Sequence, residues 1–127
     1  MDKPVNVEQF KLGMRSLAHA VNIVTAAHGG HRYGMTATAV CSASAEPPTV
    51  LVCMHRNSGT HGGVARSKAF CVNLLRAEDS ELSNLFSGAL SGEGRFKSRD
   101  WSKLATGSPV LLDALVSFDC RVVKKFA

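Results

Sequence analysis

Two short segments of the chain carry the residue types from which a ligand site could be built. The first spans residues 33–42, Tyr-Gly-Met-Thr-Ala-Thr-Ala-Val-Cys-Ser, and has almost no side-chain bulk. Small residues let a flat ligand approach the backbone of a strand, where amides and hydroxyls can bond its heteroatoms. A strand packed tightly against a helix or a second subunit would have the same composition. The residues that create this ribbon are Gly34, Thr36, Ala37, Thr38, Ala39 and Ser42.

The second segment, residues 55–61, reads His-Arg-Asn-Ser-Gly-Thr-His and precedes an expected helix. Free amides at a helix start, with the hydroxyls of Ser58 and Thr60 beside them, form a phosphate cradle to which Arg56 could add charge. An ordinary capped helix would explain Ser58 and Thr60 equally well. Together the two segments offer a flat surface and an anion site at adjacent strand ends, which is what a nucleotide requires.

Other kinds of site lack the residues they need. The five histidines have no carboxylate or cysteine at ligand spacing, so no metal site is expected. Neither a hydrolase motif nor the glycine fingerprint of a P-loop or dinucleotide fold occurs. The cysteines show no CxxC pairing, and we expect buried thiols in a reducing cytosol. They are Cys41, Cys53, Cys71 and Cys120.

Length and composition indicate one globular domain covering residues 1–127, with 45% hydrophobic and 20% charged residues. No apolar run is long enough to span a membrane, and the first residues lack the pattern of a signal peptide, so we expect a cytoplasmic protein. The net charge of +5 suits an anionic partner. Because the basic residues are dispersed and not interleaved with aromatics, a phosphate-bearing small molecule fits better than nucleic acid.

The pattern predicts strands connected by short helices. A helix is expected from a cap at Asn6, with Gln9 at the capping-box position and the core stripe Phe10, Met14 and Leu17. Two further helices are expected, one ending near residue 67 and one from residue 79 or 80 to 86, and residues 78–81 are expected to be a solvated helix start. The expected strands span 21–26, 33–45, 49–54, 69–75 and 114–123, with a glycine hairpin at 28–31, a central strand at 49–54 and a loop at 87–109. This density of strands indicates a mainly β fold, an antiparallel barrel or sandwich.

Seven stretches follow one another in the order and spacing of a known family, between about Phe10 and Val122. They are residues 20–25 (AVNIVT), 34–42 (GMTATAVCS), 47–53 (PPTVLVC), 70–75 (FCVNLL), 82–86 (LSNLF), 95–96 (RF) and 114–121 (ALVSFDCR). In these the chain resembles the flavin reductases that supply reduced flavin to two-component monooxygenases. The nearest branch is that of the pyrimidine-utilisation and 4-hydroxyphenylacetate reductases, which the Thr-Ala-Thr-Ala pattern at 36–39 suits.

The resemblance implies a split β-barrel of the FMN-binding type with a few short connecting helices, assembled as a homodimer. It implies FMN or FAD as cofactor and NADH or NADPH as hydride donor for a flavin oxidoreductase that feeds an oxygenase component. It places the isoalloxazine ring along Gly34, Met35, Thr36, Ala37, Thr38 and Ala39, and the ribityl phosphate near Cys53, Met54, His55, Ser58 and Thr60. No general acid is required, because the flavin itself carries the hydride. The alternatives are a non-catalytic flavin- or haem-binding split barrel and an inactive truncated fragment.

One departure from the family concerns the C-terminal end. Family members continue past the strand near Val123 with a Gly-(Asp/Thr)-His motif and further strands, whereas this sequence stops at Phe126-Ala127. We therefore expect a C-terminally incomplete domain whose last barrel strands are missing. The sheet edge at residues 115–123 would then be open to self-association or to a partner chain.

Overall fold

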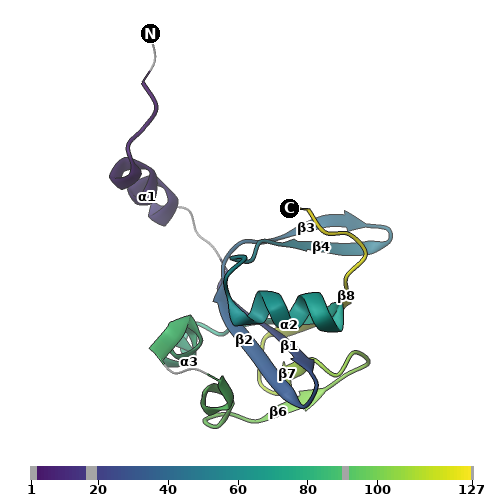
Figure 1. Cartoon of the computed structure of the whole chain (residues 1–127). Helices are drawn as coiled ribbons and strands as arrows, with labels where there is room; N and C mark the ends of the chain where they lie inside the picture. The colour runs from purple at the N-terminus through teal and green to yellow at the C-terminus, as the bar shows by residue number, and fades with distance from the viewer. Residues whose placement is uncertain (1–2, 17–19, 90–91, 127) are drawn as a thin grey trace.

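A four-stranded antiparallel sheet, with strand order β2-β1-β5-β8, forms the centre of the protein (Figure 1). The structure is a computed structural model that describes residues 3–16, 20–89 and 92–126. The strands are β1 (Asn22–His28), β2 (His31–Ala37), β5 (Ala69–Leu74) and β8 (Val116–Arg121). The first five residues of β1 and of β5 are all buried, because these two strands lie inside the sheet and are covered on both faces.

Two smaller antiparallel sheets accompany the central one. The hairpin of β3 (Val40–Ala45) and β4 (Pro48–Val52) lies above α2 in Figure 1, and β6 (Trp101–Lys103) pairs with β7 (Pro109–Leu111). The described strands thus form three separate sheets rather than one closed barrel. The helices are α1 (Val7–Ser16), α2 (Gly59–Ser67), α3 (Ser80–Asn84), the π-turn η1 (Leu85–Ala89) and the 3-10 turn η2 (Gly92–Phe96). No helix of the described residues is long and apolar enough to cross a membrane.

Each face of the central sheet has its own apolar core. On one face, the rings of Phe86, Phe96 and Trp101 pack together at centroid distances of 5.0–5.6 Å against Ile23 and Leu111. On the other face, α2 and the inner side of the β3–β4 hairpin cover the sheet. The residues of this second core include Val24, Val64, Phe70 and Val72, with the partly buried Val40, Val50 and Val52 packed against them.

Most of the predicted elements are confirmed. Asn6 and Gln9 form the capping box, each side chain accepting a hydrogen bond from the other's backbone amide. The hairpin at 28–31 turns through Gly29 and Gly30, at φ values of 59° and 81° that glycine adopts without strain. The mainly β architecture with short connecting helices is confirmed as well. The long segment 33–45 proves to be two strands, separated at residues 38–39.

Three predictions about burial and order were wrong. The 49–54 run is not a central strand: β4 pairs only with β3, and its alternation leaves Leu51 43% exposed. The stripe on α1 is not core, because α1 stands apart from the sheets in Figure 1 and leaves Phe10 57% and Met14 40% exposed; Leu17 lies outside the described residues. The segment 87–109 is not a plain loop, because it holds the end of η1 and all of η2 and β6, and its Phe96 and Trp101 pack in the first core.

Candidate functional site

The two candidate segments meet where β2 leaves the central sheet. The amide of Cys53 donates to the carbonyl of Ala39 at 3.0 Å, which joins the end of β4 to the β2–β3 link. Ser58, the residue that caps α2, lies against Met35 with an Oγ–Sδ distance of 3.8 Å. Residues 14 and 23 positions apart in the chain are thereby brought together, and a ligand could contact both segments at once.

The free edge of β2 presents backbone hydrogen-bonding groups rather than reactive side chains. β2 is an edge strand of its sheet. Its pairing with β1 starts at His28 and His31, the residues on either side of the two-residue turn. In an antiparallel pair alternate residues direct their backbone groups to the partner, so Gly34 and Thr36 direct theirs away from β1. Thr38 lies just past the end of β2, and its carbonyl accepts from the amide of Val40 at 2.9 Å. Among the described residues, no strand pairs with this edge. A planar heterocycle with polar atoms along one side is the kind of ligand that such an edge can bond.

The side chains of Gly34 and Thr36 serve the protein's own packing. A Cβ on Gly34 would lie 2.5 Å from a ring carbon of Phe86, so glycine is required there by the aromatic core. The hydroxyl of Thr36 donates to the carbonyl of Ser83 in α3 at 2.6 Å. Tight packing, which was the alternative interpretation of residues 33–42, therefore explains part of the small-residue pattern. A ligand at Gly34 and Thr36 would contact the backbone rather than the side chains.

The start of α2 is a capped helix terminus. The backbone of Ser58 is extended, and its Oγ accepts from the amide of His61 at 3.1 Å. The first-turn amides carry the partial positive charge of the helix. The ring of His55 accepts from the amide of Asn57 through Nδ1 at 3.2 Å, which leaves Nε2 as the position of the proton in the neutral ring. Thr60 is 3% exposed, so its side chain faces the interior rather than an anion.

Exposure separates the predicted site residues into three groups. Those at the open surface are Thr38, Ala39, Cys53 and His55, whereas Gly34, Ala37 and Thr60 are buried and Met35, Thr36, Met54 and Ser58 are half-buried. The prediction of buried thiols was wrong for Cys41 and Cys53, which are exposed because they face outward from the β3–β4 pair. The site of a single chain is thus an open surface.

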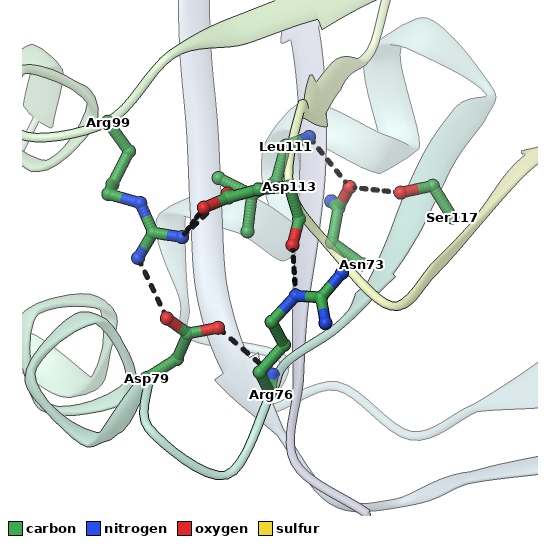
Figure 2. Close-up of polar contacts among 7 residues, drawn as sticks. All are labelled: Asn73, Arg76, Asp79, Arg99, Leu111, Asp113 and Ser117. Carbon is green, nitrogen blue, oxygen red and sulfur yellow. Dashed lines mark hydrogen bonds and ion pairs between the residues drawn. The ribbon is translucent and has the colours of Figure 1, made fainter.

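A polar network that sequence patterns did not predict holds α3 in place (Figure 2). Arg99 donates to Asp79 at 2.9 Å and to both oxygens of Asp113 at 2.6 Å. Arg76 also links the two aspartates, because its backbone amide donates to the carboxylate of Asp79 and its Nε donates to the backbone carbonyl of Asp113. The hydrogen bonds from Arg99 hold the pKa of Asp113 below its usual range. Asp79 is 7% exposed, so the expectation of a solvated helix start was wrong at that residue.

A second polar centre ties β5 to its neighbours (Figure 2). Asn73, fully buried, accepts from the Leu111 amide and the Ser117 hydroxyl, each at 2.9 Å. Its amide nitrogen donates to the carbonyls of Ile23 at 3.1 Å and Pro109 at 3.4 Å. One side chain thus connects β1, β5, β7 and β8, which fixes the sheet whose outer strand carries the candidate edge.

Surface hollows occur elsewhere on the molecule. One of about 270 Å³ is lined by Arg99, Asp113 and residues around them, and another of about 300 Å³ lies between α3 and Arg99. Neither includes a predicted site residue. The candidate site is defined by its backbone edge and the α2 terminus rather than by a cavity.

Comparison with known proteins identifies the family. Residues 14–127 match the model of the flavin reductase like domain, and the chain belongs to this family. It is 45% identical over 120 residues to the FMN reductase (NADH) RutF of Pantoea ananatis and 48% identical over 113 residues to that of Agrobacterium fabrum, with 94% and 89% of this chain covered. The resemblance seen in the sequence is thereby confirmed.

Solved structures support the same assignment. A crystal structure assigned as a flavin reductase, from Haemophilus somnus, matches 94% of this chain and 77% of its own with a TM-score of 0.91 and 46% identity. The flavin reductase PheA2 matches 97% of this chain and 78% of its own with a TM-score of 0.86 and 30% identity. The split-barrel fold class is therefore confirmed. This chain spans 63% of the length of the Pantoea relative and 65% of the Agrobacterium relative.

Proposed function

We propose that this chain forms the flavin-binding part of an NADH-dependent FMN reductase that supplies reduced flavin to a partner oxygenase. The observation that carries the proposal is the identity of 42–48% to relatives named FMN reductase (NADH), over at least 89% of this chain. The contacts that bring the β2 edge and the start of α2 together supply a surface on which a flavin could bind. As a single domain over residues 1–127, the chain would work in the cytoplasm, where reduced nicotinamides are available.

The residues present fit a flavin. The backbone groups of Gly34 and Thr36 and the amide of Thr38 would bond the polar side of the ring, and the exposed Ala39 has no side chain long enough to block it. The first-turn amides of α2, with Ser58 beside them, would hold the phosphate. The bound flavin would accept hydride from the nicotinamide. The chain's contribution is to position the ring and to stabilise its negative charge with backbone amides.

A homodimer belongs to this proposal because one chain offers only an open surface. The exposed residues Thr38, Ala39, Cys53 and His55 leave one side of a bound ring in water. A second subunit over that surface would exclude water and strengthen the hydrogen bonds from the β2 edge. FAD in place of FMN, and NADPH in place of NADH, remain substrates to be compared in the same assay.

The ring placement is tested at Thr38. Proline at this position removes the amide proton that we propose bonds the ring, whereas Thr38→Ala keeps it. We expect Thr38→Pro to weaken binding of FMN and of riboflavin about tenfold in a fluorescence titration, and Thr38→Ala to change neither by more than about twofold. Unchanged affinity in the proline variant, with a folded circular dichroism spectrum, would contradict the ring placement.

The phosphate placement is tested at Ser58. Glycine is nearly as good an N-cap as serine, so Ser58→Gly removes the hydroxyl while costing the helix only a few tenths of a kcal/mol. We expect this variant to lose affinity for FMN but not for riboflavin, which has no phosphate. Equal losses for the two ligands would refute the phosphate role.

Activity separates the competing functions. Oxidation of NADH that depends on added FMN indicates a reductase, whereas flavin binding without turnover indicates a flavin-binding split barrel. A protein that binds neither flavin nor haem is an inactive fragment. The assay should compare this chain with a full-length relative under identical conditions.

A further inference from the structure

The tip of the β1–β2 hairpin carries two histidines side by side. His28 ends β1 and His31 begins β2, and the register places them directly opposite each other across the turn. Both side chains are exposed, at the end of the central sheet that lies away from the β3–β4 hairpin (Figure 1). The spacing of the five histidines along the sequence predicted no complete set of metal ligands, but the fold pairs these two.

The turn fixes how far apart the two rings can lie. Gly29 and Gly30 have φ values of 59° and 81°, which suit a two-residue type I′ turn. Residues directly opposite each other project from the same face of the sheet, with their Cβ atoms about 4.5–5.5 Å apart. Two nitrogens that each bind one metal ion at about 2.0–2.1 Å lie about 3 Å from each other. Rotation about the side-chain torsions can bring the two imidazole rings of such a pair to that separation.

We propose that His28 and His31 together bind a divalent transition-metal ion, each through one ring nitrogen, with water completing the coordination. Imidazole suits Cu²⁺, Ni²⁺ and Zn²⁺, whereas Ca²⁺ and Mg²⁺ prefer oxygen ligands. Among the described residues, no group of three or more histidine, cysteine, aspartate or glutamate side chains could hold a metal ion. Two protein ligands therefore make an exchangeable site rather than a closed structural one. The inference is independent of the proposed function.

The charges around the pair are largely balanced. Arg32, next to His31 in β2, directs its side chain to the opposite face of the sheet, where its Nε donates to Glu93 at 2.8 Å. Hydrogen bonds from Arg32 are the main cause that holds the pKa of Glu93 below its usual range, and the charge of His31 contributes to the same effect. Arg66 of α2, which donates to the Tyr33 hydroxyl at 2.9 Å, is a positive charge that opposes a bound cation.

Titration with Ni²⁺ is the first measurement. Ni²⁺ does not oxidise thiols as Cu²⁺ does, and a Cys41→Ser/Cys53→Ser background removes the exposed thiols that could bind it. Calorimetry on protein without a polyhistidine tag should show one Ni²⁺ per chain. We expect His28→Asn and His31→Asn each to weaken binding at least about tenfold. The double variant should weaken it little further, because one remaining imidazole cannot chelate.

Matched controls separate the paired geometry from the number of histidines. Ala27→His/His28→Ala keeps five histidines but moves one to the opposite face of β1, so it should bind Ni²⁺ as weakly as His28→Asn. His61→Asn removes a histidine of α2 and should leave the affinity within about twofold of that of the parent protein. Circular dichroism shows that each variant is folded.

Thermal stability gives a second readout. Because the ion would bind both strands only in the folded hairpin, Ni²⁺ should raise the Tm of the parent protein but not that of His31→Asn. A parent protein that binds no Ni²⁺, an affinity unchanged by His28→Asn or by moving the histidine to position 27, or an equal loss in His61→Asn would each overturn the proposal.

Discussion

Replacing Asn73 with leucine tests whether the buried polar centre holds the central sheet together. Leucine has the same side-chain branching as asparagine with two larger methyl groups, so the change removes the hydrogen bonds without leaving a cavity. The amide of Leu111 would lose its acceptor in a site where both residues are at most 2% exposed. The half-buried Ser117 hydroxyl can rotate and hydrogen-bond to water instead. The carbonyl of Pro109 still accepts a hydrogen bond from the hydroxyl of Thr25.

The expected cost follows from that accounting. One orphaned buried donor costs about 1–3 kcal/mol, and the weaker losses add about 1 kcal/mol, so Asn73→Leu should lower the free energy of unfolding by about 2–4 kcal/mol. Urea unfolding followed by circular dichroism measures the difference, and an unchanged m-value would show that the unfolded state is not affected. Asn84→Leu, on the exposed end of α3, should cost less than about 0.5 kcal/mol. A loss below about 1 kcal/mol for Asn73→Leu would refute the reasoning.

Three further predictions concern other parts of the fold. Gly34→Ala should destabilise the protein by about 1–3 kcal/mol in urea unfolding, because its methyl group would overlap the facing phenylalanine ring; a stabilised variant would contradict this. Burial raises the pKa of Cys71 to about 12, with the charge of Asp119 adding to the effect, so a maleimide at neutral pH should label Cys53 in the folded protein and Cys71 only after unfolding. Because the pKa of Asp113 is lowered in the folded state, its stabilising effect is present above the ordinary aspartate pKa of about 4 and is lost as the pH falls through the folded value. Thermal unfolding should therefore show a smaller stability loss between about pH 5 and 3 in Arg99→Gln than in wild type, and parallel pH curves would count against it.

The sequence predicted those elements whose signal is local. The capping box at Asn6, the glycine hairpin after β1 and the N-cap at Ser58 each depend on residues within a few positions, and the structure has all three. The family resemblance gave the split-barrel class, which spacing alone left open between barrel and sandwich. The two halves of the candidate site were also predicted, and the Cys53–Ala39 hydrogen bond shows them adjacent.

The errors arose where tertiary context decides. Residues 50–54 are all apolar, but only alternate residues face the second core, so hydrophobicity could not distinguish a central strand from a hairpin. The helical spacing of Phe10 and Met14 predicted that α1 has a buried face, but the spacing could not indicate which part of the protein would cover it. The pairing of Asp79 with Arg99 joins residues twenty apart through a loop of irregular pattern, and nothing in the local sequence indicates it.

The outward-facing amides of β2 have a consequence for how such a site can change during evolution. Main-chain groups persist through side-chain replacement, so residues such as Thr38 and Ala39 can vary while the hydrogen-bonding surface is retained. An alanine scan would not detect these groups, because alanine keeps the backbone amide and carbonyl. Replacing the Thr36 amide by an ester through chemical ligation removes a single donor, and it would show directly how much recognition the peptide backbone provides.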